Sequence, residues 1–229
     1  MTKWKELAFD SLQMKLIGFI MTFVGAVGIT FFSGEKQQMI RLILEFISYP
    51  AVAIFAFLVV EGCQKTENMR KYGIAMTLAA IAAEPFYDYA CIGVWLDYGS
   101  ANGQNFLFAL LLCMFVIVLL RTAEQSEKWK NFMILSLVLA IPFWAMLTNV
   151  RFSGLAMLLT VVFYVLREKP KARLYVALAV GTALKVTGGL SAVLIHKYSG
   201  QRGTYSKYLF YALYPVMWAV LAAVKLLTA

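Results

Sequence analysis

The sequence predicts an all-α fold, a polytopic membrane helix bundle with about eight transmembrane helices. Hydrophobic residues make up 62% of the 229 positions and charged residues only 14%. A soluble domain of this length has no core large enough to hide that much apolar surface, so the lipid bilayer must be the solvent. The basic residues, which give a formal charge of +9, lie in short loops between apolar runs. This positive-inside pattern is typical of membrane proteins and argues against a nucleic-acid partner.

The segment 1–13 is expected to form a short amphipathic helix in the headgroup layer, ahead of a single transmembrane domain over 14–229. When this segment is helical, its apolar side chains share one face: Trp4, Leu7, Ala8 and Leu12. The first apolar run then ends in SGEKQQ, with no small-residue cleavage site. We therefore expect a retained span and not a signal peptide.

Apolar runs place the spans at 14–32, 41–62, 72–90, 105–121, 131–148, 152–167, 173–195 and 208–227. A helix needs about 20 residues to cross the hydrocarbon, and 152–167 is short, so about seven or about nine spans are alternatives. Prolines inside these runs predict kinks: Pro50, Pro85, Pro142 and Pro215. A stripe of small residues on the first span favours close helix packing: Gly18, Thr22 and Ala26.

Basic residues are distributed unequally between alternate loops. The richer side holds Lys3, Lys5, Lys15, Lys65, Arg70, Lys71, Arg121, Lys128, Lys130, Arg167, Lys169, Lys171, Arg173 and Lys225. The poorer side holds Lys36, Arg41, Arg151, Lys197, Arg202 and Lys207. Because cytoplasmic loops carry the excess of lysine and arginine, we expect both termini in the cytoplasm.

Ionisable residues inside the predicted spans are the main candidates for function: Glu45, Glu61, Glu84, Asp88 and Lys185. Glu84 and Asp88 are one helical turn apart, on either side of Pro85. Two carboxylates that close in a low dielectric cannot both ionise cheaply, so one takes a proton or a cation lies between them. Lys185 and Arg151 are the available partners. A polar pocket for a charged substrate or a proton and a buried ion-pair network that fixes helix register both remain open.

The other polar residues give weaker signals. Glu61 and Glu45 are interpreted as charges at helix ends, and the single histidine, His196, as a solvated side chain at an interface. The cysteines are odd in number and scattered, so no disulfide framework or metal site is predicted: Cys63, Cys91 and Cys113.

Four stretches together resemble the TraX family of membrane proteins. They are SYPAVAIFAFLVVEGCQKTENMRKY (48–72), AAEPFYDYA (82–90) with QNFLFALLLCM (104–114), NVRFSGLAMLLTVVFYVLRE (149–168) and SGQRGTYSKYLFYALYPVMWAV (199–220). The family is named for an F-plasmid protein that acetylates pilin. The resemblance therefore implies a bacterial cytoplasmic-membrane protein and acetyl or acyl transfer from acetyl-CoA or another acyl-CoA.

The chain departs from the family pattern where acid–base groups are expected. Gly25 and Ala26 stand where family members carry an Asp-His pair, and Tyr214-Pro215 is followed by Val216 and Met217, without the usual histidine. Two further positions also differ, where Lys65 stands for a histidine and Asn149 for an aspartate. The packing pattern survives these changes, so we expect the scaffold to be kept and the usual transfer chemistry to be lost.

Three hypotheses follow. In the first, the protein is a binding or partner subunit whose ligand-binding residues are Glu61, Lys65, Asn105, Asn149, Lys185 and Arg202. In the second, it is a divergent acyltransferase in which Glu84 or Asp88 is the catalytic base and Arg202 or Lys65 holds the phosphates of coenzyme A. In the third, it is a small transporter with an ion relay through Glu84, Asp88 and Lys185. The expected partners are the lipid bilayer and another membrane protein or a peptide substrate.

Overall fold

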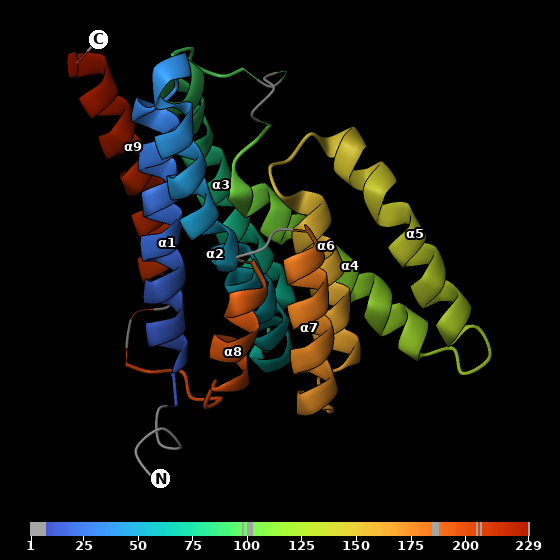
Figure 1. Ribbon diagram of the computed structural model, residues 1–229. Coiled ribbons are helices and arrows are strands. Elements are labelled where there is room, and N and C mark those ends of the chain that lie inside the picture. The colour runs from blue at the N-terminus through green and yellow to red at the C-terminus, as the bar shows by residue number, and fades with distance from the viewer. Residues whose placement is uncertain are drawn as a thin grey trace, which may run out of the picture.

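The computed structural model describes residues 8–97, 99, 103–184, 188–204, 206 and 208–228 and shows a bundle of helices (Figure 1). In chain order the elements are α1 (Ser11–Phe31), the 3-10 helix η2 (Glu35–Gln37), α2 (Gln38–Lys65), α3 (Met69–Ile92), α4 (Phe106–Glu124), α5 (Lys130–Thr148), α6 (Ser153–Val165), α7 (Pro170–Leu184), the 3-10 helix η3 (Gly188–Leu190), α8 (Ser191–His196) and α9 (Leu209–Thr228). Within the described ranges the only strand-like pairs are two isolated bridges, Phe9 with Tyr198 and Gln104 with Val150. The predicted all-α class is confirmed.

In the described part of the chain, 5 helices are long and apolar enough to cross a membrane. They are Ser11–Phe31, Glu35–Lys65, Phe106–Glu124, Lys130–Thr148 and Leu209–Thr228. The helix α3 is long but carries several charged residues, and α6 has only 13 residues. The protein is therefore a membrane protein, although this criterion does not reproduce the expected count of about eight spans.

The single span expected over 173–195 is wrong. The helix α7 ends at Leu184, and the chain resumes as η3 and then α8, a helix of 6 residues that packs against α7. Gly189 permits this return, because a Cβ atom there would overlap the Thr182 hydroxyl oxygen. The segment is thus a helical hairpin whose two arms lie in the same half of the bundle (Figure 1).

Because of the hairpin, α9 ends at a different end of the bundle from the one that the sequence predicts. The first described residues and the end of α9 lie at opposite ends of the bundle (Figure 1). The start of α1 is fixed beside the segment after α8, because the Phe9 N–H donates to the Lys197 carbonyl at 3.0 Å. The end of α9 is fixed beside the end of α3, because the Lys225 ammonium donates to the Ala90 carbonyl at 2.8 Å. The expectation that both termini lie on one side of the membrane is therefore not confirmed.

The first helix begins earlier than predicted. Asp10 caps α1 in a capping box with Gln13, which satisfies backbone N–H groups at the helix start. Leu12 therefore belongs to the first turn of a bundle helix and not to a separate helix in the headgroup layer. The rest of the expected amphipathic segment, residues 1–7, lies outside the described residues.

Close packing of α1 on α2 depends on glycine. A Cβ atom at Gly25 would lie 2.5 Å from the Cβ atom of Ser48, and one at Gly28 would lie 2.9 Å from that of Leu44. Real Cβ atoms do not approach other atoms so closely, so the two helices can touch only because these side chains are absent. The expected small-residue stripe is present as buried or half-buried positions: Gly18, Thr22 and Ala26.

Candidate functional site

The two carboxylates of α3 bind the connection that leads to α4. Glu84 and Asp88 are almost completely buried, with exposed fractions of 3% and 1%. Glu84 Oε2 accepts from the backbone N–H of Asn105 at 3.1 Å and also from its side-chain amide. Asp88 Oδ2 accepts from the Asp97 N–H at 2.8 Å. Each carboxylate thus ties α3 to the 93–105 segment through a different residue.

Asn105 organises the start of α4 inside the bundle. Its side-chain oxygen accepts from the Leu107 N–H at 3.0 Å as the helix N-cap, and its amide donates to the Ala80 carbonyl at 2.9 Å. The next N–H, that of Phe106, donates to the Tyr214 hydroxyl oxygen at 3.2 Å. A helix N-terminus carries partial positive charge, so the nearby Glu84 carboxylate is electrostatically favourable there. Asn105, which the sequence suggests as a ligand-binding residue, thus caps α4 and binds Glu84 in the structure.

Arg151, one of the two predicted partners of these carboxylates, pairs with a different carboxylate. Arg151 pairs with Glu45, at 3.5 Å from its Oε2 atom, while Arg41 binds the other oxygen of Glu45 at 2.8 Å. Lys185 lies outside the described residues. Among the residues that the structure describes, no group of three histidine, cysteine, aspartate or glutamate side chains is placed to hold a metal ion. One oxygen of each carboxylate, Glu84 Oε1 and Asp88 Oδ1, is buried without a hydrogen-bond partner within the described ranges.

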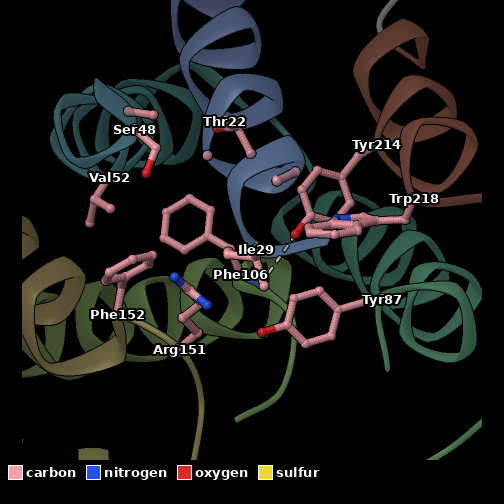
Figure 2. A pocket seen from close by; sticks show the side chains of 13 residues that line it. Thr22, Ile29, Ser48, Val52, Tyr87, Phe106, Arg151, Phe152, Tyr214 and Trp218 are labelled. Carbon is pink, nitrogen blue, oxygen red and sulfur yellow. Dashed lines mark hydrogen bonds between the residues drawn. The ribbon is translucent and has the colours of Figure 1, made fainter. Parts of the chain in front are cut away.

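A separate cavity of about 40 Å³, here called the outer chamber, lies between α1, α2, α3, α4, α9 and the connection from α5 to α6. It is lined by Thr22, Gly25, Ala26, Ile29, Ser48, Ala51, Val52, Tyr87, Phe106, Arg151, Phe152, Tyr214 and Trp218. Figure 2 shows the Arg151 guanidinium reaching into it beside Phe152, with the Tyr87 hydroxyl pointing toward the guanidinium. The Arg151 guanidinium carbon lies 4.8 Å from the centre of the Phe152 ring. The chamber therefore presents a cation and several hydroxyl groups within aromatic walls.

The outer chamber contains positions at which the family resemblance implies catalytic groups. Gly25 and Ala26, at which the resemblance implies an Asp-His pair, both line it, and so does Tyr214. None of the described residues that line it is a histidine, an aspartate or a glutamate.

The remaining predicted ligand-binding residues do not gather in one site. Glu61 and Lys65 form an ion pair at 2.8 Å, and Lys65 donates to the Gly200 carbonyl at 2.8 Å, which brings the exposed Arg202 segment to the same end of the bundle. Asn149 ends α5 with a left-handed backbone (φ 46°), and its carbonyl accepts from the Gln104 N–H at 2.9 Å. It therefore lies near the α3–α4 connection, away from Lys65.

Sequence reasoning missed most of the outer chamber. The hydroxyl groups of Tyr87, Tyr214, Ser48 and Thr22 come from four different helices, and no spacing along the chain links them. The sequence suggests Arg151 only as a partner for the α3 carboxylates and as a basic residue of a loop. The available signal was its place in the third TraX-like stretch, next to Asn149.

Fold and site together define an all-helical integral membrane protein with a small interior chamber lined by arginine and tyrosine. The chain belongs to the TraX family, since the family model described as TraX protein matches residues 12–225. It is also similar to the "Probable fimbrial assembly protein FimC, serogroup H1" of Dichelobacter nodosus. The two are 23% identical over 246 residues, which cover 97% of this chain and 98% of that protein. No solved structure gives a significant match. The resemblance inferred from the four stretches is confirmed.

Proposed function

We propose that this protein is a pilus-associated subunit of a bacterial cytoplasmic membrane that keeps the TraX scaffold without its acetyl-transfer chemistry. Family membership and the relative described as a probable fimbrial assembly protein support the pilus association. The binding role rests on the outer chamber, whose described lining residues offer hydrogen-bond donors and acceptors but include no histidine or carboxylate.

The single observation that carries this proposal is the environment of Gly25. General base catalysis needs a histidine or carboxylate within about 2.6–3.2 Å of the proton to be removed. At Gly25 even a Cβ atom would lie 2.5 Å from Ser48 Cβ, so α1 and α2 pack where the expected aspartate would stand. A position that carries chemistry elsewhere in the family is thus a packing position in this chain.

The chemistry of the outer chamber indicates what it binds. Arg151 and Tyr87 supply donors that suit a carboxylate or a carbonyl oxygen, and arginine does so with planar geometry. With a volume of about 40 Å³ the chamber holds only a few atoms. We expect it to bind one carboxylate or carbonyl group of a partner polypeptide and not a whole coenzyme.

The orientation in the membrane follows from the charge distribution. One end of the bundle contains the start of α1, the α2–α3, α4–α5 and α6–α7 connections and the segment after α8. This end carries most of the described basic residues: Lys15, Lys65, Arg70, Lys71, Arg121, Lys128, Lys130, Arg167, Lys169, Lys171, Arg173, Lys197 and Arg202. The opposite end carries Lys36, Arg41, Arg151 and Lys225. By the positive-inside rule the first end is cytoplasmic, and the end of α9 is extracytoplasmic.

The proposal is tested with purified full-length protein, radiolabelled acetyl-CoA and peptides from pilin N-termini. We expect no acetyl transfer, and we expect pilin subunits reconstituted in the same bilayers to crosslink to the protein. Arg151→Ala should reduce that crosslinking about tenfold, which corresponds to about 1.4 kcal/mol. Lys36→Ala, at an exposed residue outside the chamber, is the matched control. Acetyl transfer that Glu84→Gln abolishes would overturn the non-catalytic assignment.

A divergent acyltransferase is the second candidate, and one observation favours it. Glu84 and Asp88 each keep a buried oxygen without a hydrogen-bond partner among the described residues. A catalytic base needs such an oxygen to remove the proton of the group that receives the acyl chain. In that reaction acetyl-CoA or another acyl-CoA would be held by Lys65 and Arg202, whose segments meet at the proposed cytoplasmic end. The same acetyl-CoA assay decides between the two functions.

A further inference from the structure

A larger cavity, here called the end pocket, lies at the basic end of the bundle, where α2, α4 and α6 end. Its volume is about 380 Å³, which falls within the range of about 300–1,000 Å³ that is usual for small-molecule sites. It is lined by Glu61, Gln64, Arg121, Tyr164, Arg167 and Glu168. Every described lining residue is polar, and none of them also lines the outer chamber.

The end pocket lies at the level of the lipid headgroups. Glu61 and Gln64 belong to the end of α2, Arg121 lies in the last turn of α4, and Tyr164 is next to the last residue of α6. Since α2 and α4 are both long and apolar enough to cross a membrane, their ends mark the border between hydrocarbon and headgroups. A pocket at this level is accessible both to a lipid headgroup and to a solute of the adjacent aqueous phase.

One wall of the end pocket is held by a network around Glu124. The Tyr164 hydroxyl donates to Glu124 Oε2 at 2.8 Å, and the Arg167 guanidinium pairs with Glu124 Oε1 at 2.9 Å. Arg167 also donates to the Tyr164 carbonyl at 3.0 Å, and its guanidinium carbon lies 4.6 Å from the centre of the Tyr164 ring. This wall is therefore formed before a ligand arrives, which reduces the entropy cost of binding.

The charged side chains of the end pocket are not all paired. Glu61 and Arg167 each form an ion pair, at 2.8 Å and 2.9 Å. Among the described residues, neither Arg121 nor Glu168 forms one. The Arg121 guanidinium is held in place by donating to the Cys63 carbonyl at 2.7 Å, which uses one of its five N–H groups. The pocket thus presents one unpaired cation and one unpaired carboxylate to the same ligand.

This charge pattern favours a zwitterion. Guanidinium groups bind phosphate oxygens with matching planar geometry, so an anionic group of the ligand suits Arg121. An ammonium group suits Glu168, and the C-terminal ends of α2, α4 and α6, which carry partial negative charge, favour a cation at the same level. A ligand with several phosphates and no cation would leave Glu168 unpaired and would lie near the Glu61 carboxylate.

We propose that the end pocket binds a ligand with one phosphate and one primary ammonium group, the phosphate at Arg121 and the ammonium at Glu168. Phosphoethanolamine has this chemistry, both as a free solute and as the headgroup of phosphatidylethanolamine. A cavity of about 150 Å³ holds benzene, so 380 Å³ leaves room for a group of this size. The proposal does not rest on the pilus association or on the absence of acetyl transfer, because it uses no residue of the outer chamber.

Binding of soluble probes to the purified full-length protein is the first test. The probes are phosphoethanolamine, glycerol 3-phosphate, which lacks the ammonium, and phosphocholine, whose quaternary ammonium has no N–H donor. We expect calorimetry to show that phosphoethanolamine binds about fivefold more tightly than the other two, as an ion pair with an exposed carboxylate allows. Tighter binding of adenosine diphosphate than of phosphoethanolamine would overturn the proposal and would instead favour a nucleotide-bearing coenzyme.

A lipid arm identifies the source of the ligand. Native mass spectrometry of the protein with equal amounts of phosphatidylethanolamine, phosphatidylglycerol and phosphatidylcholine measures which lipid is retained. Preferential retention of phosphatidylethanolamine assigns the pocket to a lipid headgroup, and a preference in the soluble arm alone assigns it to a free solute. The absence of a preference in both arms would overturn the proposal.

Two substitutions locate the binding in the end pocket. Glu168→Gln should remove the preference for phosphoethanolamine and leave glycerol 3-phosphate binding unchanged, with Glu127→Gln, at an exposed glutamate of the same end, as the control. Arg121→Gln should weaken all phosphate probes about tenfold, with Arg70→Gln as its control. If Arg121→Gln prevents folding, Glu168→Gln decides, because it changes an exposed side chain, and an unchanged preference in that variant counts against the site.

Discussion

At the scale of single residues, Glu84 and Asn105 decide how the interior is organised. A buried carboxylate normally needs partners, and Glu84 obtains two donors from one residue, the backbone N–H and the side-chain amide of Asn105. The same asparagine caps α4, so a single pair joins α3 to the start of the next helix. The Glu84 side chain therefore has a structural function whether or not it also takes part in chemistry.

Glu84→Ala is predicted to destabilise the protein by about 1–3 kcal/mol, because it leaves the Asn105 donors buried without an acceptor. Glu84→Gln keeps one acceptor oxygen and should cost less. The measurement is the thermal unfolding midpoint in detergent, with Glu67→Ala, at an exposed glutamate, as the control. An unchanged midpoint for Glu84→Ala would show that the contact with Asn105 does not stabilise the fold.

Gly25→Asp is predicted to destabilise the packing of α1 on α2 by about 1–3 kcal/mol, since the new side chain overlaps Ser48. Gly34→Ala is the matched control, because the nearest atom to a Cβ there is 3.9 Å away. Both variants are compared by thermal unfolding in the same detergent. A stable Gly25→Asp protein with acetyl-transfer activity would show that this position still belongs to a catalytic site.

At the scale of elements, the hairpin of α7, η3 and α8 differs most from the sequence prediction. The run 173–195 has the length of a span, and hydropathy averaged along the chain does not register a reversal of direction. The reversal depends on Gly189, whose missing Cβ lets the returning chain approach Thr182.

The hairpin predicts that residues before α7 and after α8 are accessible from the same side of the membrane. Cysteines introduced as Lys171→Cys and His196→Cys, both at exposed positions, should react with an impermeant thiol reagent from the cytoplasmic side. Lys36→Cys should react only from the other side. The native cysteines are buried and give a low background: Cys63, Cys91 and Cys113. Labelling of positions 171 and 196 from opposite sides of the membrane would contradict the hairpin and show that the segment 173–195 crosses the membrane once.

At the scale of the whole molecule, the fold separates charge between the two ends of the bundle. With the hairpin in place, Lys197 and Arg202 join the basic end, and Lys225 moves to the opposite end beside α3. The basic residues are divided more unequally between the two ends of the bundle than between the two sides assigned from the sequence. The topology of the structure therefore agrees better with the positive-inside rule than the topology expected from the sequence.

This topology predicts an extracytoplasmic end for α9. A reporter enzyme that is active only outside the cytoplasm, fused after Thr228, should be active, and a fluorescent protein that matures only in the cytoplasm should be dark. Fusions after Glu127, in the basic α4–α5 connection, should show the reverse. If the fluorescent fusion after Thr228 is bright, both termini are cytoplasmic, as the loop charges first suggested.

The sequence alone determined the all-α membrane class, most helix positions and the burial of Glu84 and Asp88, because hydropathy and charge are sums over neighbouring residues. The tertiary structure decided which distant residues meet. Arg151, Tyr87 and Tyr214 share one chamber, and Asn105 became the partner of Glu84, because helix packing and a chain reversal at Gly189 set these distances. Such contacts depend on shape in three dimensions, for which spacing along the chain holds no signal.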